Sequence, residues 1–125
     1  MKRQAGFTLV ELMIVLVIAA ILISIAVPSY RQYVIKGNRR AAQAVMMDIA
    51  NRERQYFIGN RAFASQADLG YSLPTEVSNN YTYTVTPGAG PPPEFTITFT
   101  AIGSQAGDGN LGLTSAGDKT PPEKW

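Results

Sequence analysis

One carboxylic acid, Glu11, lies inside a long apolar stretch, FTLVELMIVLVIAAILISIAV, which runs from Phe7 to Val27. A helix of this length covers roughly 30 Å and can cross the hydrocarbon layer of a bilayer. A carboxylate in such a segment costs on the order of 2.5 to 3.5 kcal/mol by insertion scales, and such residues are usually kept for a partner. The chemistry expected of Glu11 is therefore charge pairing with a cation.

The composition argues against catalysis, because the chain contains neither His nor Cys. These two residue types supply the commonest general base, the commonest metal ligand and the thiolate nucleophile. The remaining carboxylates are scattered, and none has a spacing that indicates acid/base chemistry. We therefore expect no enzyme activity, no catalytic residue, no metal site and no cofactor.

The short segment Met1–Gly6 is basic and precedes the apolar stretch, which is the general plan of an export signal and favours a cytoplasmic amino terminus. Three interpretations are open. The stretch can be an ordinary signal peptide, cleaved after the small residues Ser24 and Ala26 so that the mature chain begins at Val27. It can also be a simple uncleaved anchor, or it can carry a specific processing motif.

The sequence Gly6-Phe7-Thr8-Leu9-Val10-Glu11 resembles the processing motif of type IV prepilins and pseudopilins. The resemblance implies cleavage between Gly6 and Phe7 by a prepilin peptidase and N-methyltransferase, which then methylates the new amino group of Phe7. It also implies that Glu11 pairs with the Phe7 ammonium of a neighbouring subunit in a filament. Two opposite buried charges offset a desolvation cost that neither bears well alone.

Beyond Val27, helix-forming residues continue through Phe57, so the chain divides into a leader (1–6), a membrane and filament-core helix (7–27), an amphipathic helical stalk (28–57) and a head (58–125). Pro28 removes a helical hydrogen bond and is expected to kink the helix, and a Pro at this place is an assembly feature of the resembling family. Apolar side chains recur along the stalk at roughly helical spacing: Tyr30, Val34, Ala41, Val45, Ile49 and Tyr56.

A basic cluster follows the apolar stretch and consists of Arg31, Lys36, Arg39 and Arg40. One interpretation is a solvated helix face with extended side chains. The other is a contact with DNA or another surface ligand, with Tyr30 and Tyr33 as stacking groups. The chain as a whole has 11 basic and 9 acidic residues, which gives no strong case for nucleic acid as an obligate partner. Both interpretations stay open.

The head begins as loop with a helical turn (58–80) and then changes to a period of two. Within Tyr81–Thr86 and Phe95–Thr100, apolar residues alternate with Thr, which predicts two strands joined by a Pro- and Gly-rich loop. A third short strand is expected at Leu111–Thr114. A sheet of this size needs the apolar side of the helix to pack against. The predicted fold class is therefore α+β: a long N-terminal α-helix packed against a small antiparallel β-sheet head, the lollipop of the pilins.

The segment from Asp108 to Lys119, together with Lys124-Trp125, is similar to the closing segment of short PilE-like and minor type IV pilins. Those proteins commonly have Cys at the positions of Asp108 and Lys124, joined as a disulfide. We hypothesise an Asp108–Lys124 ion pair in its place, with unpaired surface charges as the alternative. An exposed pair contributes about 0 to 1 kcal/mol, against about 2 to 4 kcal/mol for a disulfide, so this end is expected to fray.

Taken together, these residues predict a non-catalytic structural subunit of a type IV pilus, with possible roles in adhesion, twitching motility or DNA uptake. Its expected partners are other pilin subunits, the prepilin peptidase and the inner-membrane assembly machinery. It would cross the inner membrane once, with a periplasmic carboxyl terminus, and reach the extracellular filament on assembly. The alternatives are a pseudopilin of a type II secretion system and an exported binding domain that is released at Val27.

Overall fold

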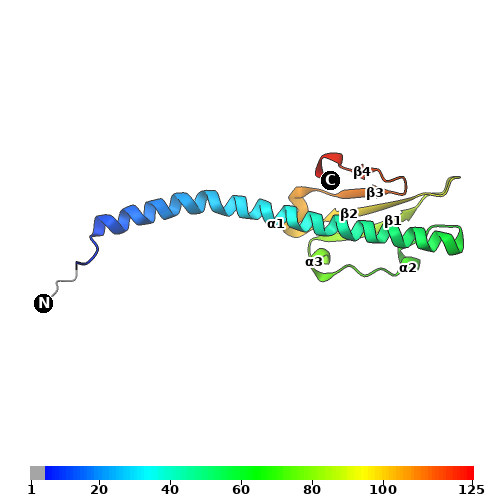
Figure 1. Cartoon of the computed structure of the whole chain (residues 1–125), viewed down its shortest axis with the longest axis horizontal. Coiled ribbons are helices and arrows are strands. Elements are labelled where there is room, and N and C mark those ends of the chain that lie inside the picture. The colour runs from blue at the N-terminus through cyan, green and yellow to red at the C-terminus, as the bar shows by residue number, and fades with distance from the viewer. Residues whose placement is uncertain (1–4) are drawn as a thin grey trace. The chain divides into compact units, whose positions relative to one another are not determined.

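The structure is a computed structural model that describes residues 5–125. It contains two compact units, the first ending at Val34 and the second comprising Ile35–Trp125. One helix, α1 (Leu9–Asn60), belongs to both and continues without interruption through Pro28 (Figure 1). The predicted helix began at Phe7 and ended at Phe57, so the prediction is displaced by a few residues at each end. The expected kink at Pro28 stays a prediction.

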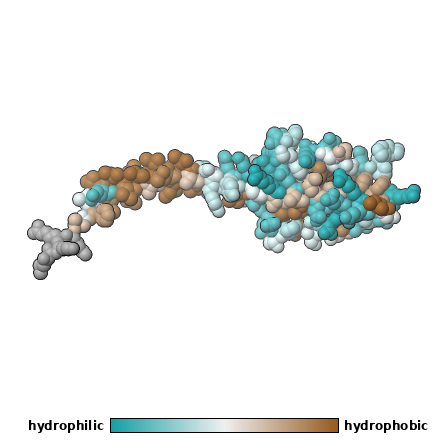
Figure 2. Space-filling model, in the orientation of Figure 1, coloured by the Kyte–Doolittle hydropathy of each residue, from teal (hydrophilic) through white to brown (hydrophobic). Residues whose placement is uncertain are grey.

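The first half of α1 is apolar on all sides. Its large apolar side chains, from Leu9 to Val27, are exposed in the isolated chain, and Figure 2 shows this part of the helix as mostly hydrophobic on the face in view. In residues 5–125, α1 is the helix with the length and composition to cross a membrane. A helix that is hydrophobic all round is stable only when lipid or protein surrounds it.

The second unit contains a four-stranded antiparallel sheet with the strand order β1-β2-β3-β4. The strands are β1 (Tyr81–Pro87), β2 (Phe95–Ala101), β3 (Leu111–Thr114) and β4 (Lys119–Thr120). The three predicted strands are confirmed, and β4 was missed. A strand of two residues followed by Pro121 has no periodicity that a sequence pattern can reveal.

The core of the second unit lies between the sheet and the later turns of α1. The alternation predicted for β1 and β2 is confirmed, because the apolar residues Tyr81, Val85, Phe95, Ile97 and Phe99 are buried and the Thr residues face outward. With Leu111 and Leu113 they pack in one cluster with Ala42, Met46, Ile49 and Ala50 of α1. This arrangement confirms the predicted α+β class.

The predicted apolar row of the helix is confirmed at Ile49, which is fully buried. At the two preceding turns it is displaced by one residue, since Ala41 and Val45 are only half-buried and flank the core, whereas Ala42 and Met46 are fully buried. One residue corresponds to about 100° around a helix, so the buried face at these turns is rotated from the predicted one. Adjacent pairs such as Ala41/Ala42 and Val45/Met46 are equally apolar, and therefore only the packed sheet decides which member faces inward.

A carboxylate, Glu53, continues the buried seam of α1 and is fully buried. Its Oε2 accepts a hydrogen bond from the backbone N–H of Ala64 (2.8 Å), while its Oε1 has no hydrogen-bond partner within residues 5–125. Burial raises the pKa of Glu53, although the Ala64 hydrogen bond opposes this shift. Glu53 thereby ties the chain that leaves α1 back onto the helix.

Short helices occupy the connections of the second unit. The predicted loop 58–80 contains two of them, α2 (Gln66–Leu69) and α3 (Thr75–Ser78). Ser65 caps α2 by accepting a hydrogen bond from the N–H of Asp68 (3.2 Å). Two 3-10 helices, η1 (Gly103–Asp108) and η2 (Pro122–Lys124), flank β3 and β4 and place the polar groups described below.

Candidate assembly site and basic surface

The amino-terminal end of α1 is closed by a reciprocal pair, Thr8 and Glu11. The N–H and the hydroxyl of Thr8 both donate to Glu11 Oε2, at 2.7 and 2.9 Å, and the N–H of Glu11 donates to Thr8 Oγ1 at 3.2 Å. This is a capping box, and it explains why the helix begins directly after Thr8. The negative charge of Glu11 in the first turn also complements the helix dipole. The T-x-x-E pattern was present in the sequence, but its capping role was missed.

The predicted cleavage site lies immediately before this cap. Gly6 and Phe7 are outside the helix and exposed, with 82% of the Phe7 surface accessible. A Cβ placed on Gly6 would meet no atom within 4 Å, so the space on that side of the backbone is open. The peptide bond between Gly6 and Phe7 is therefore accessible without any unwinding of α1.

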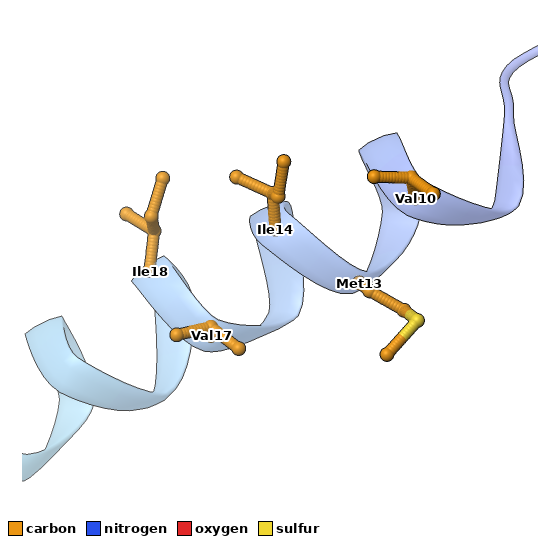
Figure 3. A pocket seen from close by; sticks show the side chains of 5 residues that line it. All are labelled: Val10, Met13, Ile14, Val17 and Ile18. Atoms are coloured by element: carbon orange, nitrogen blue, oxygen red, sulfur yellow. The ribbon is translucent and has the colours of Figure 1, made fainter.

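Five apolar side chains form one surface along the first turns of α1. Val10, Met13, Ile14, Val17 and Ile18 recur at intervals of three and four residues and line a shallow apolar groove of about 440 Å³ (Figure 3). Rows with this spacing are the ridges and grooves through which helices pack on one another. The surface is suited to a second apolar helix.

At the start of the second unit, Arg39 and Asp108 form a forked ion pair. The Nε of Arg39 donates to Asp108 Oδ2 at 2.7 Å, and its Nη2 pairs with Oδ1. Only 8% of the Asp108 side chain is exposed, and hydrogen bonding from Arg39 lowers the pKa of Asp108 while raising that of Arg39. Two parallel bonds between a guanidinium and a carboxylate make this the strong form of ion pair.

Lys124, the partner hypothesised for Asp108, is the more distant cation, with its Nζ 3.8 Å from Oδ1. Arg39, predicted as part of the basic cluster, is instead the closer partner of Asp108. Asp108 is also largely buried, which differs from the exposed pair that was expected. Arg39 and Asp108 are 69 positions apart in the sequence, which explains why no local pattern showed the contact.

A buried glutamine completes this network. Nε2 of Gln105 lies within hydrogen-bond distance of the Ile35 carbonyl (3.0 Å), the Tyr81 hydroxyl (3.0 Å) and Asp108 Oδ2 (3.2 Å). Its Oε1 accepts from the amide of Asn38 at 3.3 Å. One side chain on η1 therefore connects α1, β1 and the ion pair, and the sequence contained no signal for it.

The C-terminal segment is also bound to α1, because Gln43 Nε2 donates to the Lys124 carbonyl at 2.7 Å. Between the two lies a hollow of about 310 Å³, which we call the basic hollow. It is lined by Lys36, Arg39, Arg40, Gln43, Glu123, Lys124 and Trp125. Lys36 and Arg40 are exposed and form no salt bridge in the described part of the chain.

The structure therefore divides the predicted basic cluster. Lys36 and Arg40 line the basic hollow and form no salt bridge within residues 5–125, whereas Arg39 is held by Asp108. Arg31 is exposed and belongs to the first unit. Lys124, predicted only as a partner of Asp108, joins Lys36 and Arg40 at the hollow.

The first half of α1 is apolar and follows a Gly-Phe processing motif, and its second half packs on an antiparallel sheet. This combination defines a type IV pilin. More narrowly, the chain belongs to the ComP family of type IV minor pilins. The family model "Type IV minor pilin ComP, DNA uptake sequence receptor" matches residues 28–112, and the prokaryotic N-terminal methylation motif matches residues 1–27. The predicted family is confirmed.

Individual relatives agree with this assignment. The chain is 30% identical over 89 residues to the type IV major pilin protein PilA of Myxococcus xanthus, covering 70% of this chain and 40% of that protein. It is 28% identical over 86 residues to the type IV major pilin protein PilE1 of Neisseria gonorrhoeae, covering 66% and 39%. A fimbrial protein of Pseudomonas aeruginosa is 61% identical over 33 residues, 26% of this chain and 21% of that protein. The chain thus spans about two fifths of the length of the first two relatives.

Proposed function

We propose that this chain is a structural subunit of a type IV pilus, anchored in the inner membrane by α1 and transferred into the filament core on assembly. The observation that carries the proposal is the first half of α1, whose apolar side chains are exposed on every side in a chain of the pilin family. Lipid covers such a helix before assembly, and the helices of neighbouring subunits cover it afterwards. The second unit would lie in the periplasm and then on the outside of the filament.

Cleavage between Gly6 and Phe7 by a prepilin peptidase would leave the cap of α1 intact. The capping N–H belongs to the amide between Phe7 and Thr8, which remains after the leader is removed. Both capping bonds from Thr8 use Glu11 Oε2, and Oε1 makes no hydrogen bond within residues 5–125. One oxygen therefore holds the helix end while the other is free to accept the methylated Phe7 ammonium of a neighbouring subunit.

Mass spectrometry of the chain in sheared, purified filaments tests this proposal. The expected mature chain begins at N-methylated Phe7 and is present in the filaments. A mature chain that begins at Val27 would instead indicate an exported domain released from a signal peptide. A chain that begins at N-methylated Phe7 but is absent from filaments, and whose deletion blocks protein secretion, would support the pseudopilin alternative.

A second function is favoured by one specific observation. The matching family model describes a DNA uptake sequence receptor, and this chain has a basic hollow in which Lys36 and Arg40 carry unpaired charges beside Lys124. We propose that this hollow contacts the phosphates of duplex DNA, the group that such cations bind most readily. Arg39 would hold the C-terminal segment in place through Asp108 and would not itself contact DNA.

Fluorescence anisotropy of a labelled duplex with the full chain in detergent micelles tests the DNA contact. Lys36→Gln/Arg40→Gln is expected to weaken binding and to reduce the slope of log K against log salt by about 1.8, since each phosphate contact contributes roughly 0.9. The matched control is Arg54→Gln/Arg61→Gln, which also removes two exposed basic side chains. Arg54 lies near the end of α1, and Arg61 directly follows the helix. Equal losses in both variants would mean that the hollow is not the DNA-binding surface.

A further inference from the structure

The outer face of the sheet consists almost entirely of threonine. The strand register places Thr82 opposite Thr100, Thr84 opposite Thr98 and Thr86 opposite Thr96 on β1 and β2. Thr96 in turn faces Thr114, while Gly112 of β3 lies between Thr98 of β2 and Thr120 of β4. We call this surface the threonine face: Thr82, Thr84, Thr86, Thr96, Thr98, Thr100, Gly112, Thr114 and Thr120.

The chemistry of the threonine face differs from that of an ordinary solvated sheet. Threonine favours strands, which accounts for its presence at single positions. Solvent-facing strands, however, normally include charged side chains, especially Lys near edges. All nine positions of the face are uncharged, with methyl and hydroxyl groups repeating roughly every 4.8 Å across the strands and every 6.8 Å along them.

One position interrupts this array and creates a depression. Gly112 has no side chain, and the hollow above it measures about 270 Å³ and is lined by Thr96, Thr98, Asn110, Leu111, Gly112 and Thr120. A Cβ built on Gly112 would contact Thr120 Cβ at 3.4 Å, so a side chain there would fill the space. The missing side chain is what keeps the hollow open.

The groups around this hollow have unused hydrogen-bonding capacity. The hydroxyls of Thr96, Thr98 and Thr120 make no hydrogen bond within residues 5–125. Asn110 Oδ1 accepts from the N–H of Ala101 at 3.0 Å, which fixes the orientation of the amide and leaves its NH₂ group as a donor. Neutral donors and acceptors thus surround the hollow, and Leu111 lines it with backbone only, because its side chain is buried in the core.

From this arrangement we propose that the threonine face binds a neutral polysaccharide, with one sugar ring seated in the hollow at Gly112. A phosphate polymer would find no cation on this face, whereas a sugar offers the same mixture of C–H and O–H groups as threonine. The repeating rows of hydroxyls suit a ligand that is itself a repeating chain. The site is separate from the residues of the basic hollow, and its test does not depend on filament assembly.

The experiment measures binding of the full chain, in detergent micelles, to insoluble cellulose, chitin and starch by co-sedimentation. The unsubstituted chain is expected to sediment with at least one of the three polymers. Gly112→Thr fills the hollow with the chemical group that already surrounds it and is expected to weaken binding at least tenfold. Thr98→Val keeps the side-chain shape but removes a hydroxyl, and it should weaken binding about threefold to tenfold.

Thr75→Val is the matched control, because it makes the same substitution at an exposed threonine of α3, outside the threonine face. It is expected to change binding less than twofold, and circular dichroism checks that each variant keeps its fold. The proposal is overturned if the unsubstituted chain sediments with none of the polymers or if Gly112→Thr binds as well as the unsubstituted chain. Duplex DNA binding that is lost in Gly112→Thr would likewise overturn the choice of a neutral ligand.

Discussion

The two halves of α1 have the same secondary structure but different requirements for stability. In the first half the apolar side chains surround the helix and are exposed, whereas in the second half one row is buried against the sheet. The second half therefore obtains its stability within the chain, and the first half needs lipid or other helices. The proposed filament subunit would need this division, because its head would fold before assembly and its anchor would exchange one apolar environment for another.

Two carboxylates of α1, Glu11 and Glu53, show the same contrast. Glu11 is exposed and uses one oxygen to cap its own helix, while its other oxygen is open to a second molecule. Glu53 is fully buried and holds the N–H of Ala64 within its own chain. Glu11 thus has an oxygen available for the subunit contact that we propose, whereas Glu53 is bound within its own fold.

The largest expected effect comes from removing the charge of Glu11. Glu11→Leu should insert into the membrane and be cleaved normally, because leucine favours insertion and the cleavage site lies before the helix. Incorporation into filaments should nevertheless fall at least tenfold, since the Phe7 ammonium of the neighbouring subunit loses its partner.

Immunoblotting of sheared filaments against total membranes measures this incorporation. Ser24→Leu is the control, because it removes a polar group from the same apolar helix without removing a charge. Wild-type incorporation of Glu11→Leu would contradict the pairing of Glu11 between subunits.

A smaller effect is expected at the Arg39–Asp108 pair, which stabilises the head within the chain. Arg39→Met should leave Asp108 largely buried beside the more distant Lys124, and the loss is expected to be about 2 to 4 kcal/mol in the free energy of unfolding. Arg39→Met/Asp108→Leu removes both charges and should lose less than the single variant. Urea unfolding of the full chain in micelles measures both, and a double variant that loses more than the single one would contradict this account.

The smallest effect is a difference in pH dependence between Asp108 and Glu53. Arg39 lowers the pKa of Asp108 below its unfolded value of 3.8. The stability that the Asp108 carboxylate contributes is therefore present above pH 3.8 and is lost as the pH falls through the folded-state pKa. Burial raises the pKa of Glu53 above its unfolded value of 4.5. The stability that the neutral Glu53 carboxyl contributes is therefore present below pH 4.5 and is lost as the pH rises through the folded-state pKa. The two groups therefore act in opposite directions.

Glu53→Gln should remove the loss of stability that occurs above about pH 4.5 while keeping the acceptor for the Ala64 N–H. Urea unfolding midpoints between about pH 4 and pH 8 measure this change. Glu76→Gln, which alters an exposed carboxylate on α3, is the control. An unchanged pH profile in Glu53→Gln would show that burial of the Glu53 carboxyl does not affect stability.

Local patterns in the sequence were sufficient for several features of the chain. The apolar stretch indicated the membrane helix, and the residues from Gly6 to Glu11 indicated the family that the comparisons confirm. The alternation of threonine with apolar residues located β1 and β2, and Leu111–Thr114 was the third strand. Each of these signals is contained in a short continuous segment, because a period of two or a run of apolar residues is a property of neighbours in the chain.

Only the tertiary structure decided which side chains meet. It selected Ala42 and Met46 for the core, buried Glu53, and placed Arg39 rather than Lys124 closest to Asp108. These outcomes depend on the rotation of α1 against the sheet and on contacts between residues far apart in the sequence. Neighbouring helical positions of equal hydrophobicity cannot be told apart in a sequence, and a charged residue does not indicate its distant partner. Which residues are buried and which charges pair therefore depends on tertiary packing.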